Sequence, residues 1–260
     1  MGAGSGRTPR NNLLVMIRFL LLCVQNLPKL LFGRGPSVIR SGGLEFVLRP
    51  RTLDILILRE IQLVKMYTSR LAGAPLTADV VVDLGANFGA FAVWAYATLK
   101  PKRLILVEPW QPNLKILSMN AQHCGFENIA EIIPAAVYQE SGPVGFRPRP
   151  RASANSAIDE HSHLQVAALT FRDLLDKHHI KTLDYLKIDI EGGERFILSE
   201  ENRNVFSERV RYVIMEIHCT HMPIEQALTY FERLGFESYK WDPKEWGANT
   251  RMLEARNPNL

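Results

Sequence analysis

Asp-Val-Val-Val-Asp-Leu-Gly-Ala-Asn-Phe-Gly, at residues 79–89, is the segment from which the fold of this chain can be predicted. Its three valines favour a strand that is buried on both faces. Gly85 and Gly89 allow a sharp turn into a helix that starts near Ala90. The free amides at the start of that helix would face a ligand, whereas a tight turn without a ligand is the structural alternative.

The same alternation of strands and helices continues on both sides of this unit. Apolar runs predict strands at residues 44–48, 104–107, 131–137, 183–188 and 210–217. Helical periodicity predicts helices at residues 54–67, 90–99, 113–124, 174–178, 194–198 and 224–234. We therefore predict an α/β fold, with a mostly parallel sheet flanked by helices.

Two further segments complete the predicted domain. Residues 236–240 and 250–255 would add an antiparallel pair of strands at the carboxyl end of the chain. Residues 141–163 have little periodicity and could form a mobile segment over the site.

The amino-terminal region differs from the rest of the chain in charge. The 260 residues carry a net charge of +4, but residues 1–40 contain basic side chains and no acid. We divide the chain into a basic arm with an apolar helix (1–40), a helical preamble (41–78) and the main domain (79–260). Residues 13–32 are too interrupted to span a bilayer, so they would lie on a membrane, on a partner or on their own domain.

Cysteine usage gives an expectation about the compartment. The chain has three scattered cysteines that share no framework or metal-ligand spacing. This favours a reducing compartment, so we expect a cytoplasmic protein, with peripheral membrane contact as a further option.

Glu108 is the second element of the predicted ligand site. It ends the strand that follows the turn, where a carboxylate can accept hydrogen bonds from the ribose hydroxyls of an adenosine cofactor. NAD proteins use the same arrangement but prefer three glycines around a pyrophosphate, and this turn has two. The pattern therefore favours S-adenosylmethionine, with an NAD-dependent oxidoreductase as the alternative. The predicted cofactor-binding residues are Asp83, Gly85, Ala86, Asn87, Phe88, Gly89, Glu108, Pro109, Ala135 and Ala136.

Acidic side chains gather where the strand at residues 183–188 ends. Lys187 and Asp189 share one side of the extended chain, and Glu191 follows at a Gly-Gly turn. Asp189 would then lie beside the reactive group of the cofactor. A solvated strand end with a helix-capping acid is the structural alternative.

His218 ends the next strand in the sequence Met-Glu-Ile-His and titrates near neutral pH, so it could act as a general base. The predicted catalytic residues are Asp189, His218, Glu191 and Lys187. A divalent cation is a further hypothesis, and its ligands would be Asp189, Glu191, Glu216 and His218.

Together these motifs resemble the FkbM family of methyltransferases. The matching segments are residues 82–89, Val-Glu-Pro at 107–109 with Asn113 and Asn120 behind it, Leu-Thr at 169–170, residues 186–194 and Met-Glu-Ile-His at 215–218. The chain departs from the family pattern at Phe171-Arg172, where Leu-Asp is common, and at Gly193, where Ala is common.

The resemblance implies a class I, Rossmann-like fold and transfer of a methyl group from S-adenosylmethionine. The acceptor would be a hydroxyl on a sugar, glycolipid or other natural product. Asp83 and the turn would hold the amino-acid end of the donor, Glu108 the ribose, and Ala135 and Ala136 would leave room for adenine. Asp189, assisted by His218, would orient the acceptor and remove its proton.

One further function remains open, and another is not expected. The chain could be a catalytically silent membrane-binding or partner-binding protein on the same fold, as residues 13–32 suggest. A nucleic-acid substrate is not expected, because the Asn-Pro-Pro-Tyr-type tetrapeptide that grips a flipped base is replaced by Asp-Ile-Glu-Gly at residues 189–192.

Overall fold

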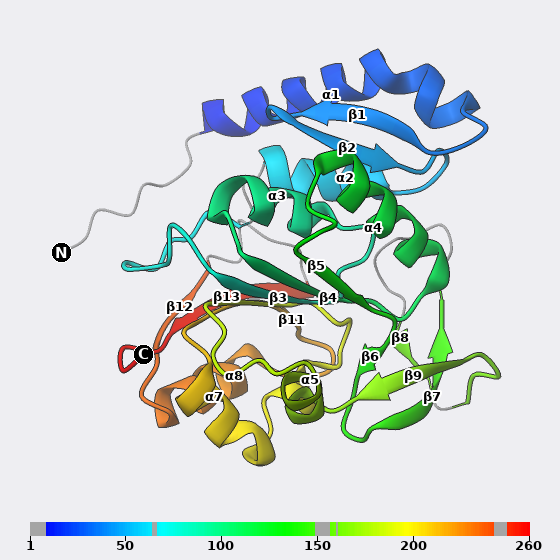
Figure 1. The fold of residues 1–260 in the computed structure, drawn as a ribbon. Coiled ribbons are helices and arrows are strands. Elements are labelled where there is room, and N and C mark those ends of the chain that lie inside the picture. Colours follow the sequence, from blue (N-terminus) through cyan, green and yellow to red (C-terminus); the bar gives the residue numbers. More distant parts are fainter. Residues whose placement is uncertain (1–8, 64–66, 149–156, 160, 242–248) are drawn as a thin grey trace.

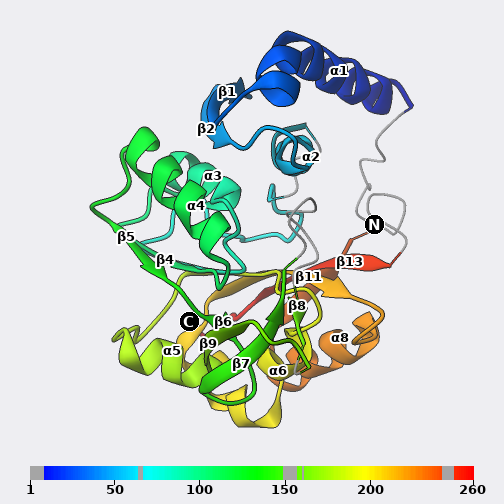
Figure 2. The ribbon, with the colours of Figure 1, turned by 90° about the vertical axis from the view of Figure 1, so that its right-hand side faces the viewer.

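A central sheet with helices on both faces forms the main body of the protein (Figures 1 and 2). The computed structural model describes residues 9–63, 67–148, 157–159, 161–241 and 249–260. The predicted mobile segment at residues 141–163 therefore lies partly outside the described residues.

The central sheet has seven strands, in the order β12-β13-β11-β10-β3-β4-β5. Five of them are parallel, and β13 is antiparallel to both of its neighbours, which confirms the predicted carboxyl-terminal pair. The strands are β3 (Val80–Leu84), β4 (Arg103–Val107), β5 (Ala130–Ile133), β10 (Tyr185–Ile188), β11 (Tyr212–His218), β12 (Glu237–Lys240) and β13 (Thr250–Arg256). The strand order reverses between β3 and β10, so a ligand crevice is expected at their carboxyl ends.

Helices from different parts of the chain cover the two faces (Figure 1). One face carries α3 (Ala90–Leu99) and α4 (Gln111–Cys124). The other carries α5 (Phe171–Lys177), α7 (Arg203–Arg209) and α8 (Ile224–Arg233), and the short helices α6 (Glu194–Ile197) and η2 (Glu200–Asn202) precede α7.

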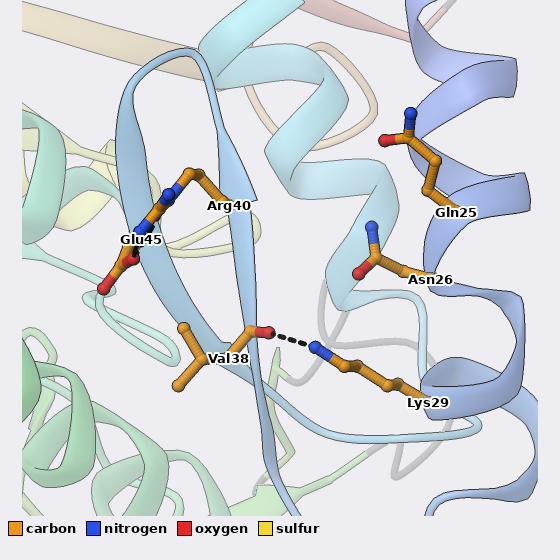
Figure 3. A pocket seen from close by; sticks show the side chains of 6 residues that line it. All are labelled: Gln25, Asn26, Lys29, Val38, Arg40 and Glu45. Carbon is orange, nitrogen blue, oxygen red and sulfur yellow. Dashed lines mark hydrogen bonds and ion pairs between the residues drawn. The ribbon is translucent and has the colours of Figure 1, made fainter.

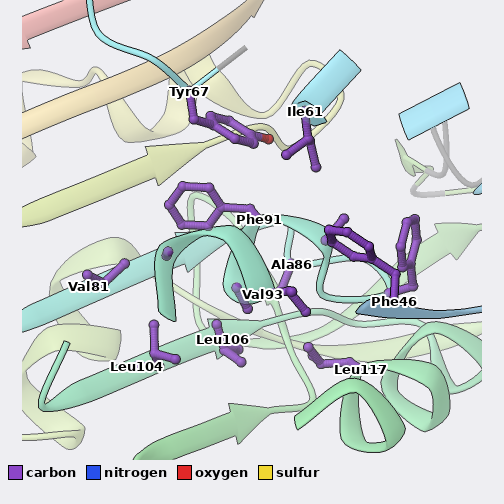
Figure 4. Close-up of a cluster of buried hydrophobic side chains, with 14 of the residues drawn as sticks. Phe46, Ile61, Tyr67, Val81, Ala86, Phe91, Val93, Leu104, Leu106 and Leu117 are labelled. Atoms are coloured by element: carbon purple, nitrogen blue, oxygen red, sulfur yellow. The ribbon is translucent and has the colours of Figure 1, made fainter. Parts of the chain in front are cut away.

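The continuous apolar strands supply both layers of the core. Val81 and Leu104 pack with the α3 and α4 layer, whereas Val82 and Ile105 pack with the opposite layer. Figure 4 shows part of the first cluster, in which side chains of β3 and β4 lie below those of α3. Helices cover both faces of β3, which explains why its sequence has consecutive valines and not an alternation of apolar and polar residues.

A second, four-stranded sheet takes up part of the strand predicted at residues 131–137 and part of the irregular segment predicted at residues 141–163. Its order is β6-β9-β7-β8, from Ala136–Val137, Gln165–Leu169, Gly142–Arg147 and Ala157–Ile158 respectively. The single strand predicted at residues 131–137 is wrong, because Pro134 separates β5 from β6. Proline has no amide to donate and so interrupts the strand pairing there. The described part of residues 141–163 also contains β7 and β8, which the sequence pattern did not indicate.

The amino-terminal region forms a layer above α3 and α4 (Figure 1). It consists of α1 (Pro9–Phe32), the hairpin β1 (Ser37–Ser41) and β2 (Leu44–Leu48), α2 (Asp54–Leu58) and the π-helix η1 (Arg59–Leu63). Phe46 and Leu48 are buried in the same cluster as the side chains of α3 and α4. The preamble therefore shares a core with the main sheet.

Asn120 joins this layer to the turn motif. Its Oδ1 accepts the amide of Val47 at 2.7 Å, and its Nδ2 donates to the carbonyls of Val47 at 3.0 Å and Phe88 at 2.8 Å. Asn120 is fully buried. Arg49 makes a second connection, because it pairs with Asp54 at 2.8 Å and donates to Asn113 at 2.7 Å. Both asparagines of the sequence motif thus hold the preamble on α4.

We expect Asn120→Ala to lower the free energy of unfolding by about 3 kcal/mol, because three buried backbone groups lose their partner. Denaturant unfolding followed by circular dichroism measures this. Gln122→Ala is the matched control, since Gln122 lies on the same helix and is exposed. Equal stability of the two variants would contradict the role given to Asn120.

Candidate functional site

The turn after β3 begins the candidate site. The amides of Gly85 and Ala86 both donate to the carbonyl of Val107 on β4, at 3.0 and 2.9 Å. Gly85 has a φ of +82°, and a Cβ there would lie 1.9 Å from the carbonyl oxygen of Asp189. Only glycine allows the turn to approach the end of β10 so closely. Ala86 and Phe88 are buried in the core, so their backbone and not their side chains shapes the crevice.

Glu108 lies beside this turn, at the end of β4. Its two carboxylate oxygens accept the amides of Asn87 and Trp110, each at 2.9 Å. Burial raises the pKa of Glu108 to about 7, against the opposing effect of these hydrogen bonds. The side chain of Asn113 also donates to Glu108. A carboxylate has about four acceptor positions, so about one remains for a ligand. Asn87, Glu108 and the half-buried Pro109 therefore lie together at the carboxyl ends of β3 and β4. Their binding of a cofactor stays a prediction.

Lys187 connects the turn to the acidic cluster. Its Nζ lies 3.0 Å from Oδ1 of Asp83, 2.8 Å from the carbonyl oxygen of Gly85 and 3.6 Å from Oδ2 of Asp189. Burial alone would lower the pKa of Lys187, but the carboxylates of Asp83 and Asp189 raise it. The lysine is therefore held as a cation inside the protein.

This arrangement changes the roles predicted for Asp83 and Lys187. The sequence suggested that Asp83 contacts the cofactor, but its side chain is fully buried and faces Lys187. Lys187 is also almost fully buried, so it orients the turn and Asp189 and does not meet a substrate directly. In this structure both side chains contact the protein, at the turn and the end of β10.

His218 is held between two carboxylates. Its Nε2 lies 3.1 Å from Glu191 and its Nδ1 lies 2.9 Å from Glu194. Burial would lower the pKa of His218, but the hydrogen bonds to Glu191 and Glu194 outweigh it and raise the pKa to about 11. Both ring nitrogens donate, so the imidazolium has no lone pair for a proton. The predicted role of His218 as general base does not fit this geometry.

Asp189 is the most exposed member of this acidic cluster, with 26% of its side chain accessible, against 18% for Glu191. Oxygen and nitrogen atoms of Asp189, Glu191 and His218 lie within 4.8 Å of one another, a spacing that suits a cation. Glu216, the fourth predicted ligand, is not part of that group among the described residues.

Glu60 and Tyr67 join the site from the preamble, and the sequence pattern did not identify them. Burial raises the pKa of Glu60 to about 7, and the nearby charge of Asp189 adds to this effect. Burial also raises the pKa of Tyr67, again with Asp189 contributing. An acid within an apolar helical segment was the available signal for Glu60. Its π-helix is a further one, since such turns are frequent at functional sites.

Ala135 and Ala136, predicted beside the adenine, follow β5 and are buried. Ala135 packs in the core under β4 and β5, and Ala136 packs in the small sheet. The two alanines therefore belong to different hydrophobic clusters, and their place beside an adenine stays a prediction.

A separate hollow lies between α1 and the β1–β2 hairpin (Figure 3). Gln25, Asn26 and Lys29 line it from the helix, opposite Val38, Arg40 and Glu45 of the hairpin. It contains none of the residues at the strand ends, so we do not assign it to the candidate site.

Comparison with known proteins identifies the family of this chain. The family model described as the methyltransferase FkbM domain matches residues 83–238, which include the turn, Glu108, Asp189 and His218. A comparison with curated protein sequences finds no match.

Solved structures resemble this chain at low sequence identity. The FkbM methyltransferase of Methylobacillus flagellatus KT superposes with a TM-score of 0.50 and 15% identity, over 90% of this chain and 59% of that chain. Fibrillarin of Aeropyrum pernix with natively bound S-adenosyl-L-methionine has a TM-score of 0.46 and 13% identity, over 85% of this chain and 83% of that one. This chain therefore spans about three fifths of the FkbM structure.

The pKa of Glu60 leads to a prediction about stability. Folding raises this pKa from its ordinary 4.5 to about 7, so the folded chain holds the proton more tightly than the unfolded chain. Ionisation of Glu60 opposes folding, so the free energy of unfolding falls as the pH rises from about 5 to about 8. Glutamine does not ionise, so we expect the free energy of unfolding of Glu60→Gln to rise by about 2 kcal/mol relative to that of the wild type over this range.

Urea unfolding at several pH values measures this difference. Glu208→Gln is the control, because Glu208 is exposed on α7. Curves for Glu60→Gln and wild type that stay parallel from pH 5 to 8 would show that Glu60 is not in the buried, acidic environment described.

Proposed function

The chain belongs to the FkbM methyltransferase family, and we propose that it transfers a methyl group from S-adenosylmethionine to a hydroxyl oxygen of a small molecule. The proposed acceptors are sugars, glycolipids and related natural products. The observation that carries this proposal is the position of Asp189. Its carboxylate is tied through Lys187 to the carbonyl of Gly85, so an acceptor-side acid lies next to the donor-side turn.

On the donor side, the proposal assigns the backbone of residues 85–89 to the amino-acid end of S-adenosylmethionine. Glu108 would accept a ribose hydroxyl with the acceptor position that Asn87, Trp110 and Asn113 leave free. Ala135 and Ala136 would border the adenine. Asp83 would act indirectly, by holding Lys187 and thereby the turn.

On the acceptor side, the proposal assigns orientation and proton removal to Asp189. Methyl transfer forms an O–CH₃ bond as the S–CH₃ bond breaks, and S-adenosylhomocysteine leaves. The hydroxyl proton would pass to the carboxylate of Asp189 and then to water. Glu191 and the His218 imidazolium would support this carboxylate and not accept the proton. Glu60 is the alternative base, because a pKa of about 7 suits proton transfer near neutral pH.

In a second version of the proposal, the acceptor site also holds a divalent cation. The ligand atoms of Asp189, Glu191 and His218 have a suitable spacing for a cation. Glu194 would orient the imidazole ring of His218 through its contact with Nδ1. The cation would have to displace the imidazolium proton, so its binding would strengthen as the pH rises.

Two alternatives remain as outcomes of the tests. An NAD-dependent oxidoreductase would bind NAD, whereas the proposed methyltransferase would bind S-adenosylhomocysteine. A catalytically silent protein would bind neither acceptor nor donor productively. The main experiment is a mass-spectrometric screen for products that gain one methyl group, with and without a chelator. Methylated product in the chelated sample would remove the cation from the proposal.

The donor site gives the next prediction. We expect Glu108→Ala to weaken S-adenosylhomocysteine binding about 100-fold in calorimetry, because hydrogen bonds to the ribose and the support of Asn87 are both lost. Glu131→Ala, on neighbouring β5, is the control and should bind like the wild type. Unchanged binding by a folded Glu108→Ala variant would place the donor elsewhere.

The acceptor site gives a complementary prediction. We expect Asp189→Asn to keep donor affinity within about threefold and to lower kcat about 100-fold or more, because the amide cannot take the proton. Asp79→Asn, at the opposite end of the sheet, should retain full turnover. Retained turnover in Asp189→Asn together with a large loss in Glu60→Gln would reassign the base to Glu60.

A further inference from the structure

Helix α1 lies across the outside of the protein, above the preamble (Figures 1 and 2). One side of it packs inward. Leu22 is buried, and Phe19, Asn26 and Leu30 are half-buried. Arg59 of η1 lies over the ring of Phe19 at 5.9 Å. These contacts determine how the helix is rotated, and so which side chains it exposes.

The exposed side of α1 is apolar. Seven of the fourteen large apolar side chains that are exposed in the described part of the chain belong to this one helix. They are Ile17, Leu20, Leu21, Val24, Leu27, Leu31 and Phe32, with exposed fractions between 45% and 75%. At about 100° per residue they fall within an arc of about 140°. We call these seven residues the outer stripe.

An ordinary surface helix turns its apolar side toward the protein. Helix α1 packs Leu22 inward and in addition exposes the seven apolar side chains of the outer stripe. Figure 3 shows Gln25, Asn26 and Lys29 on the side of α1 that borders the hairpin. Lys29 donates to the carbonyl of Val38 at 3.2 Å. Lys29 thus contacts the hairpin, while the outer stripe has no covering element among the described residues. Exposed apolar patches of this kind mark interaction sites.

The charge around the stripe indicates what covers it. The chain has six basic residues before its first acid, Glu45. By helical position, Arg18 lies beside one edge of the outer stripe. An apolar face bordered by basic side chains is the composition of helices that lie in the interface of an anionic bilayer. A second copy of the chain would instead bring two basic, acid-free helices together.

The helix does not have the properties of a spanning segment. Among the described residues, no helix combines the length and the apolar content needed to cross a bilayer. Its inner side is also occupied by contacts with η1 and β1. An orientation parallel to the membrane plane satisfies both observations.

We propose that the outer stripe of α1 docks this protein on the surface of a membrane that contains anionic lipids. The apolar side chains enter the boundary between headgroups and acyl chains, and Arg18 and the other basic residues contact lipid phosphates. This inference rests on the surface of α1 alone and does not depend on the proposed methyl transfer.

Flotation of the full chain with vesicles tests the proposal. We expect binding to vesicles of phosphatidylcholine with 30% phosphatidylserine at about 0.1 M salt, and weaker binding to phosphatidylcholine alone. Leu20→Gln/Val24→Gln should reduce binding at least tenfold, because two of the most exposed members of the outer stripe become polar.

Leu76→Gln/Leu164→Gln is the matched control, since both leucines are exposed but lie outside α1. Thermal unfolding should be the same for both double variants, because all four side chains are exposed. Wild-type protein that fails to bind the anionic vesicles would overturn the proposal, as would equal binding by the Leu20/Val24 variant. A concentration-dependent dimer that this variant abolishes, without vesicle binding by the wild type, would assign the outer stripe to a second copy.

Discussion

The rest of the site depends on the contacts of the Lys187 ammonium group. It is buried between the carboxylates of Asp83 and Asp189 and the carbonyl oxygen of Gly85. A buried charge is costly unless it is paired, so these groups must stay close together for the protein to remain folded. In this way the energetics of one side chain hold the turn after β3 against the end of β10.

The remaining charges of the crevice follow from the same low-dielectric surroundings. Glu60 and Glu108 have raised pKa values because burial disfavours their charged forms. His218 shows the opposite balance, because two carboxylates outweigh its burial and keep it protonated. The crevice therefore contains a fixed imidazolium beside acids that can change protonation near neutral pH. Such a separation of titration ranges is a common basis for acid–base assignments in enzymes.

The amino-terminal layer takes part in this site and is more than a cover for the sheet. Asn120 links β2 to the turn through the carbonyl of Phe88, and Arg49 links it to α4. The layer also brings Glu60 and Tyr67 near Asp189. On its outer surface, α1 presents apolar side chains. One segment therefore connects the crevice to the face on which we propose membrane docking.

Local sequence patterns by themselves determined the α/β fold, the turn with its two glycines and the position of Glu108 at a strand end. These features depend on periodicity, on backbone conformations that few residues adopt, and on the order of elements along the chain. Only the tertiary structure decided that Asp83 faces Lys187, that His218 keeps its proton, and that Glu60 lies near Asp189. Pairing and protonation depend on distances and burial among residues far apart in the chain, and a pattern of neighbouring residues carries no information about either.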